Sequence, residues 1–378
     1  MKKNKTIIIL QLLIPMIICS SCWDGIEINR RSVIFSLGID KNMSQDNNPD
    51  IDSPKRYSIT YAIPDMAKVS GDESISEEVV TAETAESTTF LTSIEEVQTR
   101  TQDTINFGHT KAILLGADLL KDPIMMKEII DSLERNMLFT RSTPLFAVRG
   151  RAEEVIDVDN KQYPMIGLYI MNYVNNKERA VSRYKEALLG NTIRELRENN
   201  TAIIPIIGII EDSKIEIQGG ALLKDFQLVT WFSPEEVRGI LWAEGKVKGA
   251  SIPIPVGDSY LSYTVRKQDS KITFTKDGDE IYCNIDIINE GEIGEYYINS
   301  NNSLSKDSNI KEIEKEVSGK IKSEVDHLIA QTKSYDTDII GLETELYRQH
   351  PKWQARPYKD IQVNVTVDTK IRRIGIIE

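Results

Sequence analysis

Hydrophobic and polar positions along the first half of the chain predict alternating strands and helices. Residues 32–40 and 57–63 are rich in β-branched and aromatic side chains and predict two strands joined by a polar loop. The acidic stretch 67–83 predicts a surface loop, and residues 84–101 place Leu91, Ile94 and Val97 on one helical face. A buried strand at 111–115, a helix at 123–135, a strand and helix over 143–158, and helices at 163–175 and 182–198 follow. This order predicts a mixed α/β N-terminal domain.

A small middle α+β domain is expected over residues 201–251. The apolar run "NNTAIIPIIGII" contains Pro205 and Gly208 and is too short to cross a bilayer, so we interpret it as a strand entering this domain. Short strands are predicted at 214–218, 219–222 and 226–230. Ser233, Pro234 and Glu236 then form the pattern of a capping box that opens a short helix.

From residue 252 the period of apolar positions changes to two, which predicts an antiparallel meander with a turn at Asp277-Gly278. A single apolar stripe then predicts a long helix whose face belongs to a core: Ile310, Ile313, Val317, Ile321, Val325 and Leu328. A helix at 338–353 and an alternating last strand complete an antiparallel sheet packed by long helices. The fold class expected is therefore α+β, with three domains at 22–200, 201–251 and 252–378.

Residues 1–21 have the pattern of a signal peptide. Lys2, Lys3 and Lys5 precede an apolar run from Thr6 to Ile18 that is too short to span the membrane as a stable helix. The alternative is a buried N-terminal helix, but this run has no polar face. The pattern therefore predicts export.

Two cysteines follow this run, and one of them suits lipid attachment. Cys22 is preceded by the small residues Ser20 and Ser21, as the signal peptidase for lipoproteins requires, whereas Cys19 follows two isoleucines. Cleavage before Cys22 would remove Cys19 and leave Cys22 to carry an S-diacylglycerol and an N-acyl chain. Two or more acyl chains anchor a protein stably, so a lipid tether to the membrane is expected. Cys283, the other cysteine of the mature chain, has no partner for an internal disulfide.

Charge and composition narrow the classes of partner. The formal net charge is −12, and removal of the three leader lysines makes it −15, which argues against nucleic acid and against lying flat on anionic lipid. His109, His327 and His350 are scattered, so no zinc site and no cofactor are predicted, and each histidine is expected at a helix end or on the surface.

The sequence contains no set of residues typical of catalysis. It has no Gly-x-Ser-x-Gly elbow, phosphate-binding glycine loop or His-Glu-x-x-His helix. Carboxylate pairs such as Glu153-Glu154 suit solvated helix faces, and Cys283 lies in an alternating strand, where it is expected to act as a small buried hydrophobe. We therefore expect that the protein is not an enzyme.

Four segments carry a family resemblance: "CWDGIEINRRSVIFSLGID", "NFGHTKAILLGADLL", "FAVRGRAEEVIDV" and "GGALLKDFQLVTWFSPEEVRGILWAEGK". They resemble, in this order, the start of the mature chain, the next two segments and the middle domain of the Ger(x)C spore germination lipoproteins, the C subunits of nutrient germinant receptors. "YDTDIIGLETELYRQHPKWQ" resembles their C-terminal motif, so Asp338, Gly341, Pro351 and Trp353 fall on family positions, as His109 does in "NFGHTKAILLGADLL". We expect these five residues to maintain the fold.

The resemblance implies a noncatalytic lipoprotein on the extracytoplasmic face of the inner spore membrane, assembled with multispanning A and B subunits and needed for germination. Cys22 would be the anchor, with Trp23, Asp24 and Glu27 beside the bilayer. Trp23 could equally cap the first domain. Two other classes remain open: a solute-binding lipoprotein of a transporter, which would show two similar parallel lobes, and an anchored cell-wall hydrolase, which would need an acid/base or metal set.

Overall fold

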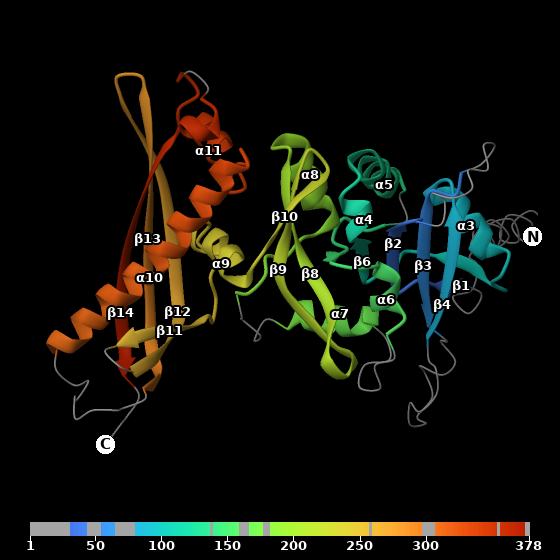
Figure 1. The fold of residues 1–378 in the computed structure, drawn as a ribbon, viewed down its shortest axis with the longest axis horizontal. Helices are drawn as coiled ribbons and strands as arrows, with labels where there is room; N and C mark the ends of the chain where they lie inside the picture. The colour runs from blue at the N-terminus through green and yellow to red at the C-terminus, as the bar shows by residue number, and fades with distance from the viewer. Residues whose placement is uncertain are drawn as a thin grey trace, which may run out of the picture.

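The computed structural model describes residues 31–43, 54–64, 80–136, 139–158, 166–176, 182–256, 259–296, 307–353 and 356–374. Within these residues the strands form three sheets, of two, eight and four strands (Figure 1). The two-stranded sheet pairs β1 (Arg31–Val33) with β5 (Thr104–Asn106) in parallel. The predicted signal peptide and the Cys22 segment lie outside the described residues.

The eight-stranded sheet is mixed and has the order β10-β9-β8-β7-β6-β2-β3-β4. Its central strands β2, β6, β7 and β8 run parallel, and the flanking strands pair antiparallel. A single residue pair, Ala147 with Ile206, joins β7 to β8. The strands are β2 (Ser36–Lys41), β3 (Tyr57–Pro64), β4 (Val80–Ser87), β6 (Ala112–Gly116), β7 (Leu145–Val148), β8 (Thr201–Ile210), β9 (Lys214–Lys224) and β10 (Gln227–Phe232).

Helices cover both faces of this sheet because its central strands are apolar on both faces. In β6, Ile113 and Leu115 lie in the core beneath one group of helices, and Ala112 and Leu114 in the core beneath the other. The first group is α3 (Phe90–Gln98), α4 (Ala117–Leu120), α5 (Pro123–Arg135) and α8 (Leu189–Glu198). The second group is α6 (Ala152–Ile156) and α7 (Ile166–Asn175).

Two predictions in this half were wrong. The helix expected at 182–198 begins only at Leu189, because Leu188 forms a β-bridge with Pro144. Residues 80–87, which we expected in a loop and the first turns of a helix, form β4, and α3 begins only at Phe90, with Thr89 as its N-cap. Small residues and glutamates suit an edge strand held to β3 by backbone hydrogen bonds, which the side-chain pattern does not reveal. The buried face of α3 also differs, since Phe90 and Val97 are buried while Leu91 is 62% exposed.

The predicted middle segment continues the eight-stranded sheet. β9 is one strand where we expected two, and it passes through Gly219 at φ 70°, where a Cβ atom would lie 2.5 Å from the carbonyl oxygen of Phe232. A short 3-10 turn (Glu211–Ser213) joins β8 to β9. The predicted capping box opens α9 (Pro234–Ala243), with reciprocal hydrogen bonds between Ser233 and Glu236. The three domain boundaries stay a prediction.

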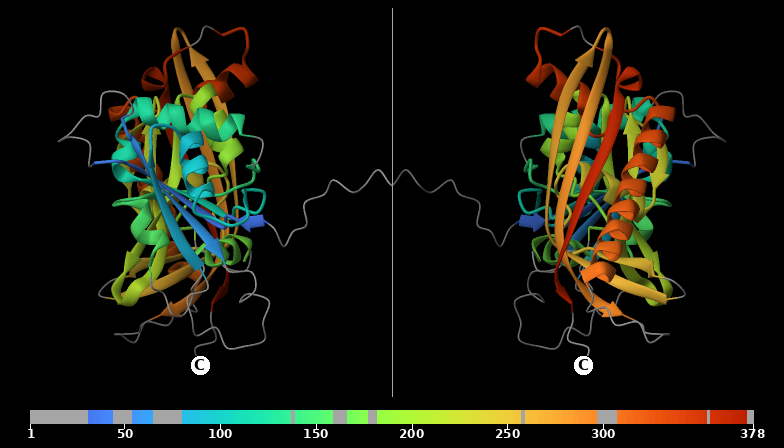
Figure 2. Two further views of the ribbon diagram at one scale, coloured as in Figure 1. Left: turned by 90° about the vertical axis from the view of Figure 1, so that its right-hand side faces the viewer. Right: turned by 90° about the vertical axis from the view of Figure 1, so that its left-hand side faces the viewer.

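The four-stranded sheet contains β11 (Ser251–Val256), β12 (Ser259–Asp277), β13 (Glu280–Tyr296) and β14 (Gln362–Ile374). The antiparallel meander is confirmed for β11, β12 and β13, but β12 is one long strand over "YLSYTVRK" and "KITFTKD", which we expected to form two strands. β14 pairs parallel with β13, whereas we expected an antiparallel sheet. The long connection through α10 (Asp307–Ser334), α11 (Leu342–Gln349) and a 3-10 turn (Tyr358–Asp360) allows this crossover. Figure 2 shows α10 running beside the sheet, and its predicted stripe is buried from Ile313 to Leu328.

Side chains of α10 also bond to β14, whose outer edge pairs with no strand among the described residues. Lys322 and Lys333 donate to the carbonyl oxygens of Val365 (3.0 Å) and Ile361 (2.6 Å). Glu314 accepts from the N–H of Ile371 at 2.9 Å. The helix therefore satisfies several backbone groups that an edge strand would otherwise expose.

α9 lies between the two large sheets and joins them (Figure 1). One small core holds side chains from β8, β9, β10, α9 and α10, among them Ile203, Leu222 and Leu328. Beside it, the buried Arg238 of α9 donates to both carboxylate oxygens of Glu324 of α10, at 2.9 and 2.6 Å, and Trp242 donates to the same carboxylate at 3.2 Å. The α+β class is thus confirmed, with mixed and antiparallel sheets.

Candidate functional site

The predicted anchor region lies outside the described residues. This holds for Cys22, Trp23, Asp24 and Glu27, so their roles stay predictions. The described chain begins with Arg31 in β1. The functional features that the structure does describe lie in the two large sheets and on their helices.

Asp338 and Gly341, two of the family positions, build the start of α11. The carboxylate of Asp338 accepts from the backbone N–H groups of Gly341 and Leu342, each at 2.9 Å, and of Glu343 at 2.7 Å. Gly341 has φ +81°, which favours glycine. Burial raises the pKa of Asp338, although the three N–H groups oppose this effect. Both residues therefore serve the fold.

The remaining family positions also lie in turns. His109 is exposed in the turn before β6. His350 ends α11 and stacks on Trp353, with ring centroids 3.8 Å apart and planes at 7°. Pro351 lies between them in an exposed turn. None of these contacts gathers a reactive set, and the predicted surface or helix-end positions of His109, His327 and His350 are confirmed.

Asp40 fills the carboxyl edge of the parallel strands, the place where open α/β sheets commonly bind ligands. It is 3% exposed, and its carboxylate accepts from the N–H groups of Ala152 (2.8 Å) and Glu153 (3.0 Å) at the start of α6. Burial raises its pKa against the opposing effect of these two donors. A Cβ atom on Gly116 would lie 1.9 Å from Oδ1 of Asp40. The protein's own carboxylate thus takes the position of an anionic ligand.

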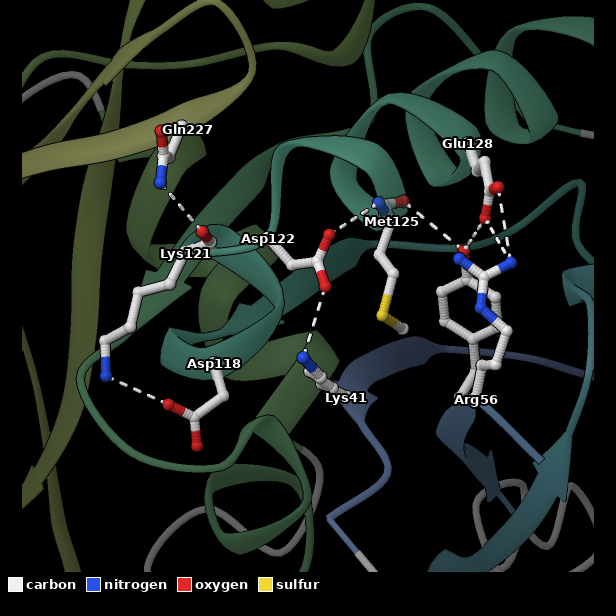
Figure 3. A network of polar contacts seen from close by, with 9 residues as sticks. Lys41, Arg56, Asp118, Lys121, Asp122, Met125, Glu128 and Gln227 are labelled. Atoms are coloured by element: carbon white, nitrogen blue, oxygen red, sulfur yellow. Dashed lines mark hydrogen bonds and ion pairs between the residues drawn. The ribbon is translucent and has the colours of Figure 1, made fainter. Parts of the chain in front are cut away.

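A polar network beside Asp40 fixes the start of α5 (Figure 3). Asp122 is the N-cap of α5, accepting from the N–H of Met125 at 3.1 Å, and Lys41 of β2 bonds to its second oxygen at 3.2 Å. Partial burial opposes ionisation of Asp122, but these donors outweigh it and hold its pKa below the usual value. Asp122 therefore ties α5 to the central strand β2.

Glu128 fixes the second turn of α5 to β3 (Figure 3). The hydroxyl of Tyr57 donates to it at 2.6 Å, and Arg56 forms an ion pair with it at 2.9 Å. Burial works against ionisation of Glu128, yet the bonds from Tyr57 and Arg56 lower its pKa overall. For Tyr57, burial and the neighbouring carboxylate both raise the pKa.

On its outer side α5 borders a surface groove of about 840 Å³, which we call the α5 groove. The groove runs between α5, the end of α8 and the turn joining β9 to β10. Its volume exceeds that of the cavities beside α9 and α11, which measure about 300 and 280 Å³. The residues that decide its character are Ile124, Lys127, Asp131, Arg197, Asp225 and Phe226.

Hydrogen bonds connect the walls of the α5 groove to one another. Gln227, next to the β9–β10 turn, donates to the carbonyl oxygen of Lys121 before α5 at 3.1 Å (Figure 3). Arg197 of α8 bonds to Glu134 of α5 at 3.0 Å. The N–H of Asp225 donates to the carbonyl oxygen of Asn200 at 2.8 Å. A site held in this way is pre-formed, as binding sites usually are.

Sequence patterns did not point to Asp40 or to the α5 groove as a site. Asp40 ends a strand in the "GID" segment, and its partner Gly116 lies far along the chain. Phe226 was expected to begin the strand at 226–230, but it lies with Asp225 in the turn between β9 and β10. Cys283 is buried as predicted, and burial raises its pKa to about 12, so its thiol stays protonated. No three His, Cys, Asp or Glu side chains in the described part of the chain gather as metal ligands.

These features define a multidomain α+β protein built on two linked sheets. Two family models match it: the spore germination protein N-terminal domain over residues 24–209, and the spore germination B3/GerAC-like C-terminal model over residues 218–375. Spore germination protein KC of Bacillus subtilis is 21% identical and aligns over 99% of this chain and 97% of its own. Spore germination protein A3 of the same organism is 25% identical over 71% of this chain and 69% of its own.

The crystal structure of the GerBC protein has the same fold. It superposes with a TM-score of 0.58 at 17% identity, covering 90% of this chain and 98% of the other. The chain therefore belongs to the Ger(x)C family of spore germination proteins, the family of germinant receptor C subunits.

Proposed function

We propose that the protein is a lipid-anchored, noncatalytic subunit of a spore nutrient germinant receptor, needed for receptor assembly or signalling. The observation that carries this proposal is the match of the two germination family models, in order, along residues 24–209 and 218–375. Multispanning A and B subunits of the same receptor would be its partners in the inner spore membrane. Its globular part would lie on the extracytoplasmic side.

Cys22 would carry the lipid anchor, and the structure limits how far the folded chain can lie from it. Arg31, the first described residue, follows Cys22 by nine positions. Nine residues of extended chain reach about 30 Å at most, so β1 would lie within that distance of the lipid. Trp23, Asp24 and Glu27 would then lie beside the bilayer, where an indole suits the interface. None of the helices among the described residues has the length and apolar character needed to cross a bilayer.

The filled sheet edge supports a noncatalytic role. In α/β sheets the carboxyl edge of parallel strands commonly holds the reacting ligand. Here Asp40 and the start of α6 occupy this edge with a closed set of hydrogen bonds. The two large sheets also differ in strand number and pairing, whereas a solute-binding lipoprotein would be expected to have two similar lobes.

Replacement of Cys22 tests the anchor. We expect Cys22→Ala to abolish both membrane retention and germination through this receptor, since the thiol that accepts the lipid is absent. Fractionation of spores and labelling with a fatty-acid probe measure the first effect, and germination assays on single nutrients measure the second. Cys19→Ala is the matched control and should keep the label, because Cys19 would leave with the signal peptide. Lipid label on the Cys22→Ala protein would reject the anchor.

A further inference from the structure

We propose that the α5 groove docks a peptide segment of a partner subunit, one that presents an apolar side chain next to a lysine or arginine. This inference rests on the proposed function, which gives the protein partner subunits, and it adds the surface that contacts one of them. The reasons lie in the groove's apolar walls, its strained turn and its charges.

Two apolar side chains face solvent at the groove. Ile124, in the first turn of α5, is 66% exposed, although the same helix buries Met125, Met126 and Ile129. Phe226, on the turn between β9 and β10, is half-buried and packs against the main core. An apolar side chain placed between these two residues would remove both from water, which is the main source of affinity at such sites.

The turn that presents Phe226 has an unfavourable backbone. It is a two-residue turn between the paired residues Lys224 and Gln227, and both of its residues are left-handed, with φ 50° at Asp225 and 66° at Phe226. Such turns favour Asn-Gly or Asp-Gly, and a bulky residue at the second position is strained. Strain of this kind concentrates at functional surfaces, and here it holds an aromatic ring at the groove wall.

The charges of the groove favour a basic neighbour on the partner. Three carboxylates and two cations line it, but Glu128 is already paired with Arg56 and Asp131 with Arg135. Arg197 already bonds to Glu134, and the Lys127 ammonium lies over the Phe226 ring at 5.9 Å from its centroid. The exposed Asp225 forms no ion pair with another side chain among the described residues, so its carboxylate is the one at the groove wall that can receive a lysine or arginine.

The shape of the groove favours a peptide over a small molecule. Its volume of about 840 Å³ is that of a ligand pocket, but it opens along the surface between two helices and a turn. Pockets for small molecules bury most of the ligand's surface. An open groove instead suits a chain that enters at one end and leaves at the other. The hydrogen-bonded frame keeps this groove formed before the partner arrives.

Photo-crosslinking in the full chain tests this inference. A photoreactive amino acid at position 124 should crosslink to one receptor subunit, at a segment that mass spectrometry shows to carry an apolar residue beside a lysine or arginine. The same amino acid at Leu91, which is 62% exposed on α3, is the matched control and should not crosslink to that segment. Equal crosslinks from both positions, or none from position 124, would overturn the proposal.

Phe226→Gly distinguishes an effect on docking from an effect on folding. It removes the aromatic ring from the groove wall, and glycine also relieves the backbone strain of the left-handed conformation. We expect the crosslink from position 124 to fall more than about tenfold, with little change in the unfolding temperature. Asp225→Asn keeps a residue that tolerates the turn but removes the negative charge. It should weaken, several-fold at low salt, the binding of a synthetic peptide with the sequence of the crosslinked segment. Unchanged binding in Phe226→Gly would rule out the groove. Position 124 could instead crosslink to an apolar-basic segment of a protein that is not a receptor subunit. That result would support peptide docking in the groove but would refute the proposed receptor role.

Discussion

The side chain of Asp40 occupies the carboxyl edge of the parallel strands, where other α/β sheets commonly bind ligands. Its carboxylate bonds the two N–H groups at the start of α6, and Gly116 leaves it the space to do so. Helix N-termini attract anions, and an internal carboxylate here takes the role of a bound phosphate or substrate. The residue is buried and is shared by strand β2 and helix α6. Its replacement should therefore affect stability more than any binding reaction.

We expect Asp40→Asn to destabilise the protein by about 1–3 kcal/mol, since an amide can accept from only one of the two N–H groups. The pH dependence has a definite sign. Because the folded pKa of Asp40 is raised, its protonated form adds stability below the unfolded pKa of about 3.9, and this stability is lost as the pH rises through the folded pKa. Urea unfolding over a pH series measures the free energy of unfolding of the wild type and of Asp40→Asn. The difference between these two free energies should shrink as the pH rises across that range.

The control for this prediction is Asp118→Asn on the neighbouring helix α4. Asp118 is exposed and forms only a surface ion pair with Lys121. Surface ion pairs contribute little to stability, so we expect the free energy of unfolding to change by less than about 1 kcal/mol. If Asp118→Asn lost as much stability as Asp40→Asn, the effect would come from the negative charge of this region and not from the hydrogen bonds of Asp40 to the start of α6.

At the scale of elements, the contact between α9 and α10 depends on a buried ion pair. Arg238 and Glu324 are both 7% exposed, and Gly239 lets the helices approach, since a Cβ atom there would lie 3.0 Å from the carbonyl oxygen of Glu324. Trp242 adds its indole N–H to the same carboxylate. A buried pair of this type gains little over an apolar pair, but the loss of one partner is costly.

Glu324→Gln should therefore destabilise the protein by about 3–5 kcal/mol, because the buried Arg238 loses its counter-charge. Replacement of both residues by leucine should recover much of this loss. Thermal unfolding of the single and double variants gives the comparison. Glu316→Gln, exposed on the same helix, should change stability by less than about 0.5 kcal/mol. A single variant as stable as the wild type would show that water reaches Arg238.

At the scale of the whole molecule, the two large sheets are joined by a continuous core rather than by a free linker. Leu328 of α10 is fully buried among side chains of β8, β9 and α9. Lys224 at the end of β9 also donates to the carbonyl oxygens of Tyr335 and Asp336 after α10. Forces on one sheet are therefore transmitted to the other.

We expect the wild-type protein to unfold in one calorimetric transition and Leu328→Ala to unfold in two. The cavity left by this substitution costs about 2–5 kcal/mol in the joint, while the cores of both sheets stay intact. Differential scanning calorimetry distinguishes the two patterns. Ile288→Ala, which removes a side chain that is 52% exposed, should leave one transition. Two transitions in the wild type would show that the joint does not couple the sheets.

The sequence predicted those elements whose side chains alone decide them. The apolar stripe of α10, the capping box of α9 and the alternation in β12 and β13 depend on local spacing, and each was confirmed. The sequence did not predict β4, because backbone hydrogen bonds to β3 rather than side-chain spacing stabilise this strand. It did not predict the parallel direction of β14, because that direction depends on the long crossover connection. Local patterns do not record either cause.

The candidate site was harder to predict than the fold. Asp40, Gly116 and Ala152 come together only in the folded sheet, and the α5 groove combines residues from three separate segments. The strained pair Asp225-Phe226 carried a weak signal, because a bulky residue follows an aspartate in a short turn between strands. The resemblance to germination proteins gave the family but did not point to this surface.

The contacts of α10 with β14 have a consequence under the proposed lipid anchor, which would hold the protein at a membrane. Tethered molecules diffuse in two dimensions and meet their copies often, and an open strand edge would let them join into ribbons. Lys322 and Glu314 occupy backbone groups of β14, and Lys333 occupies the carbonyl oxygen just before it, so a second copy finds fewer groups to pair with. A chain of this kind can stay crowded for long periods without polymerising, provided that α10 remains docked.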